Sequence, residues 1–330
     1  MASRLSAPVF GAPADYEGPD KWVVSVSWRY QKSDRHFVGH EYQAERTSEQ
    51  SEVVNRTHQA DLSATRNYDH GWRFTMSVPY LMATRSSPIR DAARVVIDRS
   101  ETQARGFGDL TLVGRKWLWD PAAQPRGNIS LGFGIKLPTG DNNVTDTRKR
   151  LDTMTGEFTY SVETVDQSIQ PGDGGFGLVF DLQMYRRFGG ERFAAYGDAT
   201  YLANPQAVSG VQTYRSAAGE EIMSIADVYL VRAGIAWYPT GGWGFSLGGR
   251  AEGVPVYDLL GSSRGFRRPG YAISLEPGVS WTKGAHTISL QIPYAVDRAR
   301  LKSVPDREND RHGDAAFADW LVLTGYTRRF

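Results

Sequence analysis

Charged side chains that could bind or steer a solute recur at every second position of otherwise apolar segments. Arg250 and Glu252, for example, are separated by one residue and share one side of an extended chain. Opposite charges placed in this way can pair with each other, or they can set up a transverse field that orients a polar or anionic solute. The alternating charges, as we call the set with this parity, are Arg29, Asp61, Arg73, Lys136, Asp181, Asp198, Arg232, Arg250, Glu252 and Glu276.

Motifs that could support catalysis or cofactor binding lie in an unsuitable context. Residues 244–248 match G-x-S-x-G around Ser246, but a nucleophile elbow requires a strand, a sharp turn and a helix. Residues 172–177 match G-x-G-x-x-G, yet no helical pattern follows them, as a dinucleotide site would require. The sequence therefore predicts no enzyme, no catalytic residue and no cofactor.

Metal ligands are also few. The chain has no Cys, which excludes thiolate sites and disulfides. His36, His40 and Glu41 would share a face only if they were helical, and we expect a solvated loop there. The sequence predicts no metal site.

The segments that carry the alternating charges have the period of β-strands. In residues 22–31 and 129–137, apolar side chains occupy one parity and polar or small residues the other. We count about twelve such strands of roughly 10–15 residues, and we find no helical stripe. On this parity Leu131, Phe133 and Ile135 face outward. We also expect that an arginine at Gly134 would narrow the interior with little effect on insertion.

Long and short connections alternate strictly along the chain. Short turns rich in Gly, Pro, Asn or Asp separate long polar segments at 33–55, 84–105, 139–173, 204–222, 257–269 and 299–316. Outer-membrane barrels have this arrangement, with short periplasmic turns and long extracellular loops. A soluble β-sandwich, the competing interpretation, gives no reason for it.

Aromatic residues are placed as expected for two girdles at the membrane interfaces. Tyr80, Tyr201 and Tyr257 lie toward the long loops. The chain ends on Phe330 with Tyr326 four residues before it, which resembles the signature that bacterial barrels present to the assembly machinery. The residues beside the short turns are Trp22, Trp72, Trp117, Trp119, Trp243 and Trp281.

Composition excludes two other classes of protein. The mean hydropathy of −0.44 leaves no run of the roughly 20 apolar residues that a membrane-spanning helix needs. The net charge of +1 lacks the basic excess of a nucleic-acid-binding protein. The first residues show no apolar signal segment, so we expect the signal peptide to have been removed from a protein of the bacterial outer membrane.

Three segments resemble the outer-membrane family named for the meta-pathway of phenol degradation. They are GFGDLTL (Gly106–Leu112), NISLGFGIKLPTGD (Asn128–Asp141) and QPGDGG (Gln170–Gly175). The resemblance covers roughly residues 20–330 and implies a transporter, with genes of the family often found near pathways of aromatic degradation. It carries over no catalytic residue.

These observations predict an all-β chain. Residues 1–20 form a periplasmic linker or a small plug, and residues 21–330 form a single antiparallel up-and-down barrel of about twelve strands. We expect passive uptake of small molecules, aromatic compounds among them, through a lumen lined by the alternating charges. The alternative is a structural or interaction barrel that transports nothing. The expected partners are the lipid bilayer, lipopolysaccharide, the barrel-assembly machinery and a small solute, and no nucleic acid.

Overall fold

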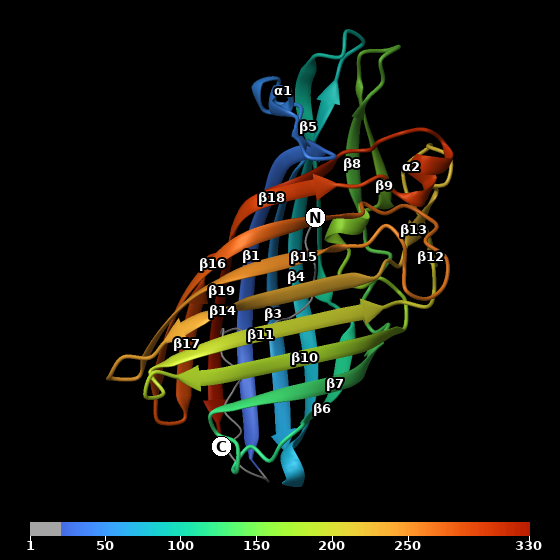
Figure 1. The fold of residues 1–330 in the computed structure, drawn as a ribbon. Helices are drawn as coiled ribbons and strands as arrows, with labels where there is room; N and C mark the ends of the chain where they lie inside the picture. The colour runs from blue at the N-terminus through green and yellow to red at the C-terminus, as the bar shows by residue number, and fades with distance from the viewer. Residues whose placement is uncertain (1–20) are drawn as a thin grey trace.

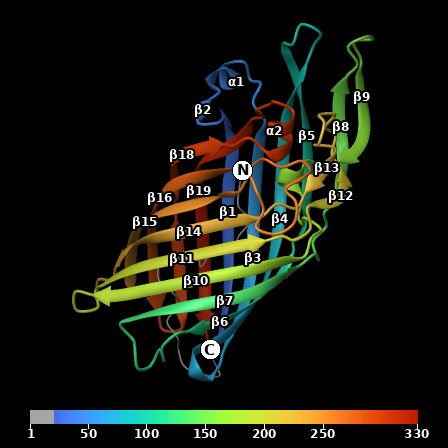
Figure 2. The same ribbon diagram turned by 45° about the vertical axis from the view of Figure 1, so that its right-hand side comes forward.

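Residues 21–330, which the computed structural model describes, form a closed antiparallel β-barrel of 12 strands. The strands run obliquely around the barrel, and hairpins project from one end (Figures 1 and 2). Pairing of the last strand with the first closes the cylinder, so the barrel leaves no free sheet edge. The fold class predicted from the alternation is confirmed. The predicted linker or plug, residues 1–20, lies outside the described residues.

Consecutive strands pair around the barrel. The uninterrupted strands are β1 (Trp22–Val38), β3 (Val54–Asn67), β4 (Trp72–Arg90), β7 (Gly127–Leu137), β10 (Gly177–Phe188), β11 (Phe193–Ala203), β14 (Val228–Trp237), β15 (Trp243–Val254), β16 (Gly270–Lys283) and β19 (Ala315–Arg329). Two further strands are broken: β5 (Val96–Phe107) continues as β6 (Leu110–Trp117), and β17 (His286–Gln291) continues as β18 (Tyr294–Arg300). Both pieces of each broken strand pair with the same neighbour, β4 or β16.

Strand β7 shows why the alternation produces two different faces. Phe133 is 55% exposed on the outside, whereas Ser130 is fully buried on the inside. Lys136 is also buried, so the charged and small residues of β7 point into the barrel. Successive side chains of a strand point to opposite faces, so the apolar residues that alternate with these polar ones form the outer surface.

The expectation for Gly134 is wrong. A Cβ atom at this position would lie 2.3 Å from the carbonyl oxygen of Leu112 and 2.8 Å from the Cα atom of Val113 on the neighbouring strand. Any side chain at Gly134 therefore collides with backbone before it reaches the interior.

Large apolar side chains are exposed around the outside of the barrel, as lipid contact requires. Trp22, Trp72, Trp119 and Trp243 belong to this exposed set near the short turns. Trp117 does not: it is 2% exposed and lies inside, with its ring under the guanidinium of Arg73 at 5.0 Å. The predicted place of Trp117 in the outer girdle is wrong, because its parity within β6 is that of the inward residues.

None of the helices among residues 21–330 is long and apolar enough to cross a membrane.

The long connections lie at one end of the barrel and contain more regular structure than the sequence suggested. Residues 84–105 are mostly an extended hairpin of β4 and β5, because the two strands pair as far as Arg90 and Val96. The other elements of the connections are β2 (Glu41–Tyr42), α1 (Ala44–Ser48), β8 (Thr145–Leu151), β9 (Phe158–Thr164), η2 (Gln167–Ile169), β12 (Val208–Gln212), β13 (Ile222–Ser224) and α2 (Val304–Glu308). The short turn between β3 and β4 holds η1 (Asp69–Gly71).

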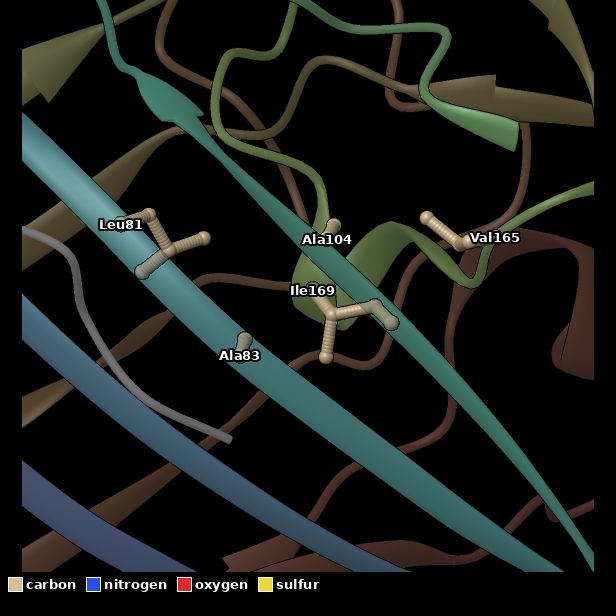
Figure 3. Packing of buried hydrophobic residues seen from close by; sticks show 5 residues of the cluster. All are labelled: Leu81, Ala83, Ala104, Val165 and Ile169. Atoms are coloured by element: carbon tan, nitrogen blue, oxygen red, sulfur yellow. The ribbon is translucent and has the colours of Figure 1, made fainter. Parts of the chain in front are cut away.

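The third connection, residues 138–176, divides into two parts. The β8–β9 hairpin projects away from the barrel (Figure 2). The following segment folds inward, where Val165 and Ile169 pack against Leu81, Ala83 and Ala104 on the inner face of β4 and β5 (Figure 3). This apolar contact holds η2 inside the mouth of the barrel.

Candidate functional site

The alternating charges all lie buried, with exposures between 1% and 7%. They come from strands around the whole barrel: Arg29 from β1, Asp61 from β3, Arg73 from β4, Lys136 from β7, Asp181 from β10, Asp198 from β11, Arg232 from β14, Arg250 and Glu252 from β15, and Glu276 from β16. Burial of so many charges requires that ion pairs or hydrogen bonds compensate them.

One network of close ion pairs, at 3.3 Å or less, joins five of these charges. The Arg250 guanidinium contacts Glu252 at 2.5 Å and Glu276 at 3.3 Å. Arg29 reaches Glu252 at 2.7 Å, and Arg232 reaches Glu276 at 2.7 Å. Each carboxylate therefore serves two guanidinium groups, which balances the cost of removing the charges from water.

This network crosses the interior of the barrel. Arg29 on β1 and Glu252 on β15 belong to strands that are not adjacent, since β16, β18 and β19 lie between them. Their contact therefore runs through the interior and not along the wall. The network braces two sides of the barrel and occupies space that a solute would need.

The remaining alternating charges form smaller contacts. Arg115, at the same parity, donates to Asp181 at 2.6 Å across Gly132. A Cβ atom at Gly132 would lie 2.9 Å from both side chains, so only glycine permits this approach. Arg73 donates to Gln183 at 2.8 Å, Asp61 accepts from Gln59 at 3.1 Å, and Asp198 lies 3.9 Å from Arg232.

A cavity of about 470 Å³ lies between the strands and the long connections. Of the alternating charges, only Arg29, Lys136 and Asp181 line it. The other seven belong to the buried contacts beyond it. All ten predicted residues therefore lie inside one barrel. Three of them line the cavity, and seven belong to the buried contacts.

One carboxylate in the mouth of the barrel ties four segments together. Asp166, just before η2, accepts two hydrogen bonds from Arg268 of the fifth connection (residues 255–269), at 3.0 and 2.8 Å. It also accepts a hydrogen bond from the hydroxyl of Tyr214 in the fourth connection (residues 204–227) at 2.8 Å, and it lies 3.5 Å from Arg85 on β4. Burial would raise the pKa of Asp166, but the Arg268 and Arg85 guanidinium groups hold it well below its usual range. We call Asp166 and these three partners the mouth clamp.

A second polar contact links the first and last long connections. His36 in β1 is buried, and its Nδ1 atom lies 2.5 Å from Asp314. Arg46 in α1 contacts the same carboxylate at 2.9 Å. The expected solvated loop at residues 36–41 is therefore wrong for His36, because β1 extends to Val38. Within residues 21–330, no group of three or more His, Asp or Glu side chains is arranged to hold a metal ion.

The three segments that carry the family resemblance meet at one point of the wall. Gly108, Gly140 and Gly172 pack backbone against backbone, and a Cβ atom on Gly140 would lie 2.7 Å from Gly108 and 2.9 Å from Gly172. Asp109 accepts hydrogen bonds from the amides of Gly140 and Asp173, at 3.0 and 3.1 Å. The Gly-Asp pairs of the three segments therefore build the junction where β5 becomes β6 and the third connection leaves the wall.

Sequence reasoning missed the mouth clamp. Arg85, Asp166, Tyr214 and Arg268 all lie in segments that the sequence presents only as polar and long. A possible signal was the placement of Arg85, which continues the inward parity of Arg73 on the same strand. No sequence pattern connects it with Asp166 or Arg268.

Comparison with solved structures finds outer-membrane barrels. The chain is similar to an outer membrane channel from Pseudomonas putida F1, with a TM-score of 0.59 and 10% identity over 96% of this chain and 97% of that chain. It is also similar to the translocator domain of the autotransporter NalP from Neisseria meningitidis, with a TM-score of 0.50 and 11% identity over 96% of this chain and 90% of that one. No family model and no curated protein matches the sequence.

At these identities the likeness concerns the fold. Together with the apolar outer surface and the buried polar interior, it defines the class: the protein is a transmembrane β-barrel of the outer-membrane type.

Proposed function

We propose that the protein is a bacterial outer-membrane channel for the passive uptake of small molecules. The observation that carries this proposal is the cavity of about 470 Å³ inside a barrel with an apolar outer surface. Its volume lies within the range of sites for small organic molecules. A solute would enter between the long connections and reach this space first.

The alternating charges are proposed to line the cavity and the path beyond it, and to control passage along that path. Because Glu252 and Glu276 each have two guanidinium partners, one contact of a carboxylate can open while the other persists. A solute would pass where contacts exchange, and fixed charges along such a path bias it between anions and cations. The interior of the barrel holds a set of positioned charges, which supports the transport of a polar or charged solute.

The transported class is proposed from the resemblance to the phenol meta-pathway family. The segments that carry this resemblance meet at the junction of Gly108, Gly140 and Gly172, so they share one structural role in this chain. We infer that aromatic compounds are among the solutes. Lipopolysaccharide around the long connections and assembly machinery at the strand ending in Phe330 are the proposed partners.

Paired cysteine variants on β6 test whether the interior conducts. Thr111 lines the cavity, and the next residue, Leu112, is exposed on the outer surface. The chain has no Cys of its own, so each new thiol is unique. In planar bilayers, a charged methanethiosulfonate should reduce the current through Thr111→Cys and leave Leu112→Cys unchanged, because only the first thiol lies in the path. Swelling of liposomes by phenolic and sugar solutes measures the same passage without a voltage.

The same experiment addresses the second candidate, a structural or interaction barrel. The buried network that crosses the interior favours this candidate, since it fills space. A scaffold would give no discrete openings and no swelling with either variant. Equal block of both variants would place the current outside the cavity and would contradict the proposal.

A further inference from the structure

The cavity has an asymmetric wall. Nine of the residues that line it are Arg or Lys, and four are Asp. Several carboxylates that compensate these cations, including Asp166, Glu252 and Asp258, do not line the cavity themselves. The cations therefore face the open space, and part of their counter-charge lies behind them.

The mouth clamp shows this arrangement most clearly. Arg268 holds Asp166 through a pair of parallel hydrogen bonds, the geometry by which arginine recognises a carboxylate. Tyr214 and Arg85 complete the carboxylate's surroundings. Arg85, Arg268 and Tyr214 all border the cavity, whereas Asp166 does not. Three side chains that bind a carboxylate therefore border the cavity, and Asp166, the carboxylate that they bind in the folded protein, does not.

A third cation, beside the two of the mouth clamp, is only weakly compensated. The Arg148 guanidinium stacks on the ring of Tyr214 at 4.0 Å, and its carboxylate contact is Glu163 at 3.8 Å. Burial lowers the pKa of Arg148. The groups around its guanidinium therefore do not fully compensate for the hydration that this cation loses. Arg148 also lines the cavity, so an anion there would gain a partner.

The cavity also has an apolar patch on the barrel wall. Val113, Val179 and Leu202 form a buried cluster with Val228 packed against it, and all four side chains line the cavity. They come from β6, β10, β11 and β14, which are rigid parts of the barrel wall. A ligand that contacts both the cations and this apolar patch has an apolar body and one negative charge.

We propose that the cavity binds an organic monoanion, a carboxylate joined to an apolar body, and that Asp166 competes with it from within the protein for Arg85, Arg268 and Tyr214. The inference rests on the proposed function in that it names the class of solute. It has one unusual consequence: removal of a negative charge from a structural clamp should strengthen binding. A purely structural aspartate would not have this effect.

Equilibrium binding to the purified full chain in detergent tests the proposal. The probes are benzoate, benzyl alcohol, which lacks the charge, and acetate, which lacks the apolar body. We expect benzoate to bind at least about tenfold more tightly than either. Asp166→Asn should raise the benzoate affinity several-fold, and Arg148→Gln should lower it.

Two further variants separate charge recognition from folding. Arg268→Gln leaves Asp166 buried without its main partner. The double variant Asp166→Asn with Arg268→Gln is therefore measured as well. Its benzoate affinity should lack the increase that Asp166→Asn alone produces. The control is Arg126→Gln, which changes an exposed arginine near a short turn and should leave the affinity unchanged. Circular dichroism and heat-modifiable migration confirm the barrel in every variant.

Three outcomes decide between the proposals. Equal binding of benzoate and benzyl alcohol, or weaker benzoate binding by folded Asp166→Asn, would overturn the carboxylate site. Passage of neutral solutes through liposomes without benzoate binding would overturn this inference and leave the proposed channel intact. Benzoate binding with no conductance and no swelling would overturn the proposed channel and leave the carboxylate site intact.

Discussion

Single residues in the interior act through their partners, and Arg250 is the clearest case. Its guanidinium is buried between Glu252 and Glu276, and these carboxylates are shared with Arg29 and Arg232. Such an arrangement stabilises a barrel only while it is complete, because removal of one partner leaves an uncompensated buried charge. Residue-scale changes therefore affect stability before they affect selectivity.

Arg250→Ala should reduce the free energy of unfolding by about 3–5 kcal/mol, the cost of breaking a buried pair. Urea titration of the purified barrel, followed by tryptophan fluorescence, measures it. The matched control is Arg126→Ala, whose side chain is mostly exposed beside Glu191 and should cause no measurable loss. A loss of the same small size in both variants would contradict the network. A shift of the reversal potential toward cations without a loss of stability would mean that Arg250 is a free channel charge.

The lowered pKa of Asp166 predicts the pH range over which the mouth clamp stays intact. Its pKa is depressed in the folded protein, so its contribution to stability is present above the ordinary value of about 3.9 and is lost only as the pH falls through the lower folded value. Cleavage of the third connection by proteinase K should therefore not depend on this group between pH 8 and pH 5.

Asp166→Asn removes the charge and should raise the cleavage rate across that whole range. The groups that face the carboxylate are Arg85, Arg268, Tyr214 and Ser168. A steep rise in cleavage of the unaltered protein between pH 6 and pH 5 would show that a group other than Asp166 controls the third connection.

At the scale of one strand, the alternation sorts side chains between lipid and interior, and close backbone contacts limit it. In β7, Phe133 faces outward and Lys136 inward. Gly134 belongs to the inner parity, yet the main chain at Leu112 leaves it no room for a side chain. The parity of a residue and the space around it are separate properties.

Phe133→Arg should destabilise the inserted barrel by about 2–4 kcal/mol, because a midplane arginine on the outer face meets lipid. Reversible folding into lipid vesicles, followed by gel migration, measures this cost. Thr111→Arg on the neighbouring strand is the matched control, since Thr111 faces the cavity. Equal costs at both positions would refute the assigned faces.

The whole molecule places its long connections at one end and its short turns at the other. The chain end at Phe330 lies on the short-turn side, where its amide donates to Trp22. Because the long connections carry the hairpins and the mouth clamp, this end is expected to face the outside of the cell.

Surface labelling on intact cells tests this orientation. Met154→Cys, at a 95% exposed position of the third connection, should react with a membrane-impermeant maleimide. Gln124→Cys, in the exposed short turn after β6, should react only after the outer membrane is opened. The reverse pattern would invert the topology.

The sequence by itself determined the features that depend on neighbouring residues. A period of two sorts side chains onto two faces of a strand wherever the strand lies, so the barrel class, the outward Phe133 and the burial of Arg29 and Arg250 were predicted. The positions of the long and short connections followed from local turn chemistry, although the sequence did not show that residues 84–105 form a regular hairpin.

Only the tertiary structure decided which residues meet. Arg29 and Glu252 are 223 residues apart, and their contact depends on closure of the barrel by β1 and β19. The mouth clamp joins η2 to β4 and two other connections, and no periodicity links these segments. Contacts of this kind arise from packing between distant segments, and a local pattern contains no information on that packing.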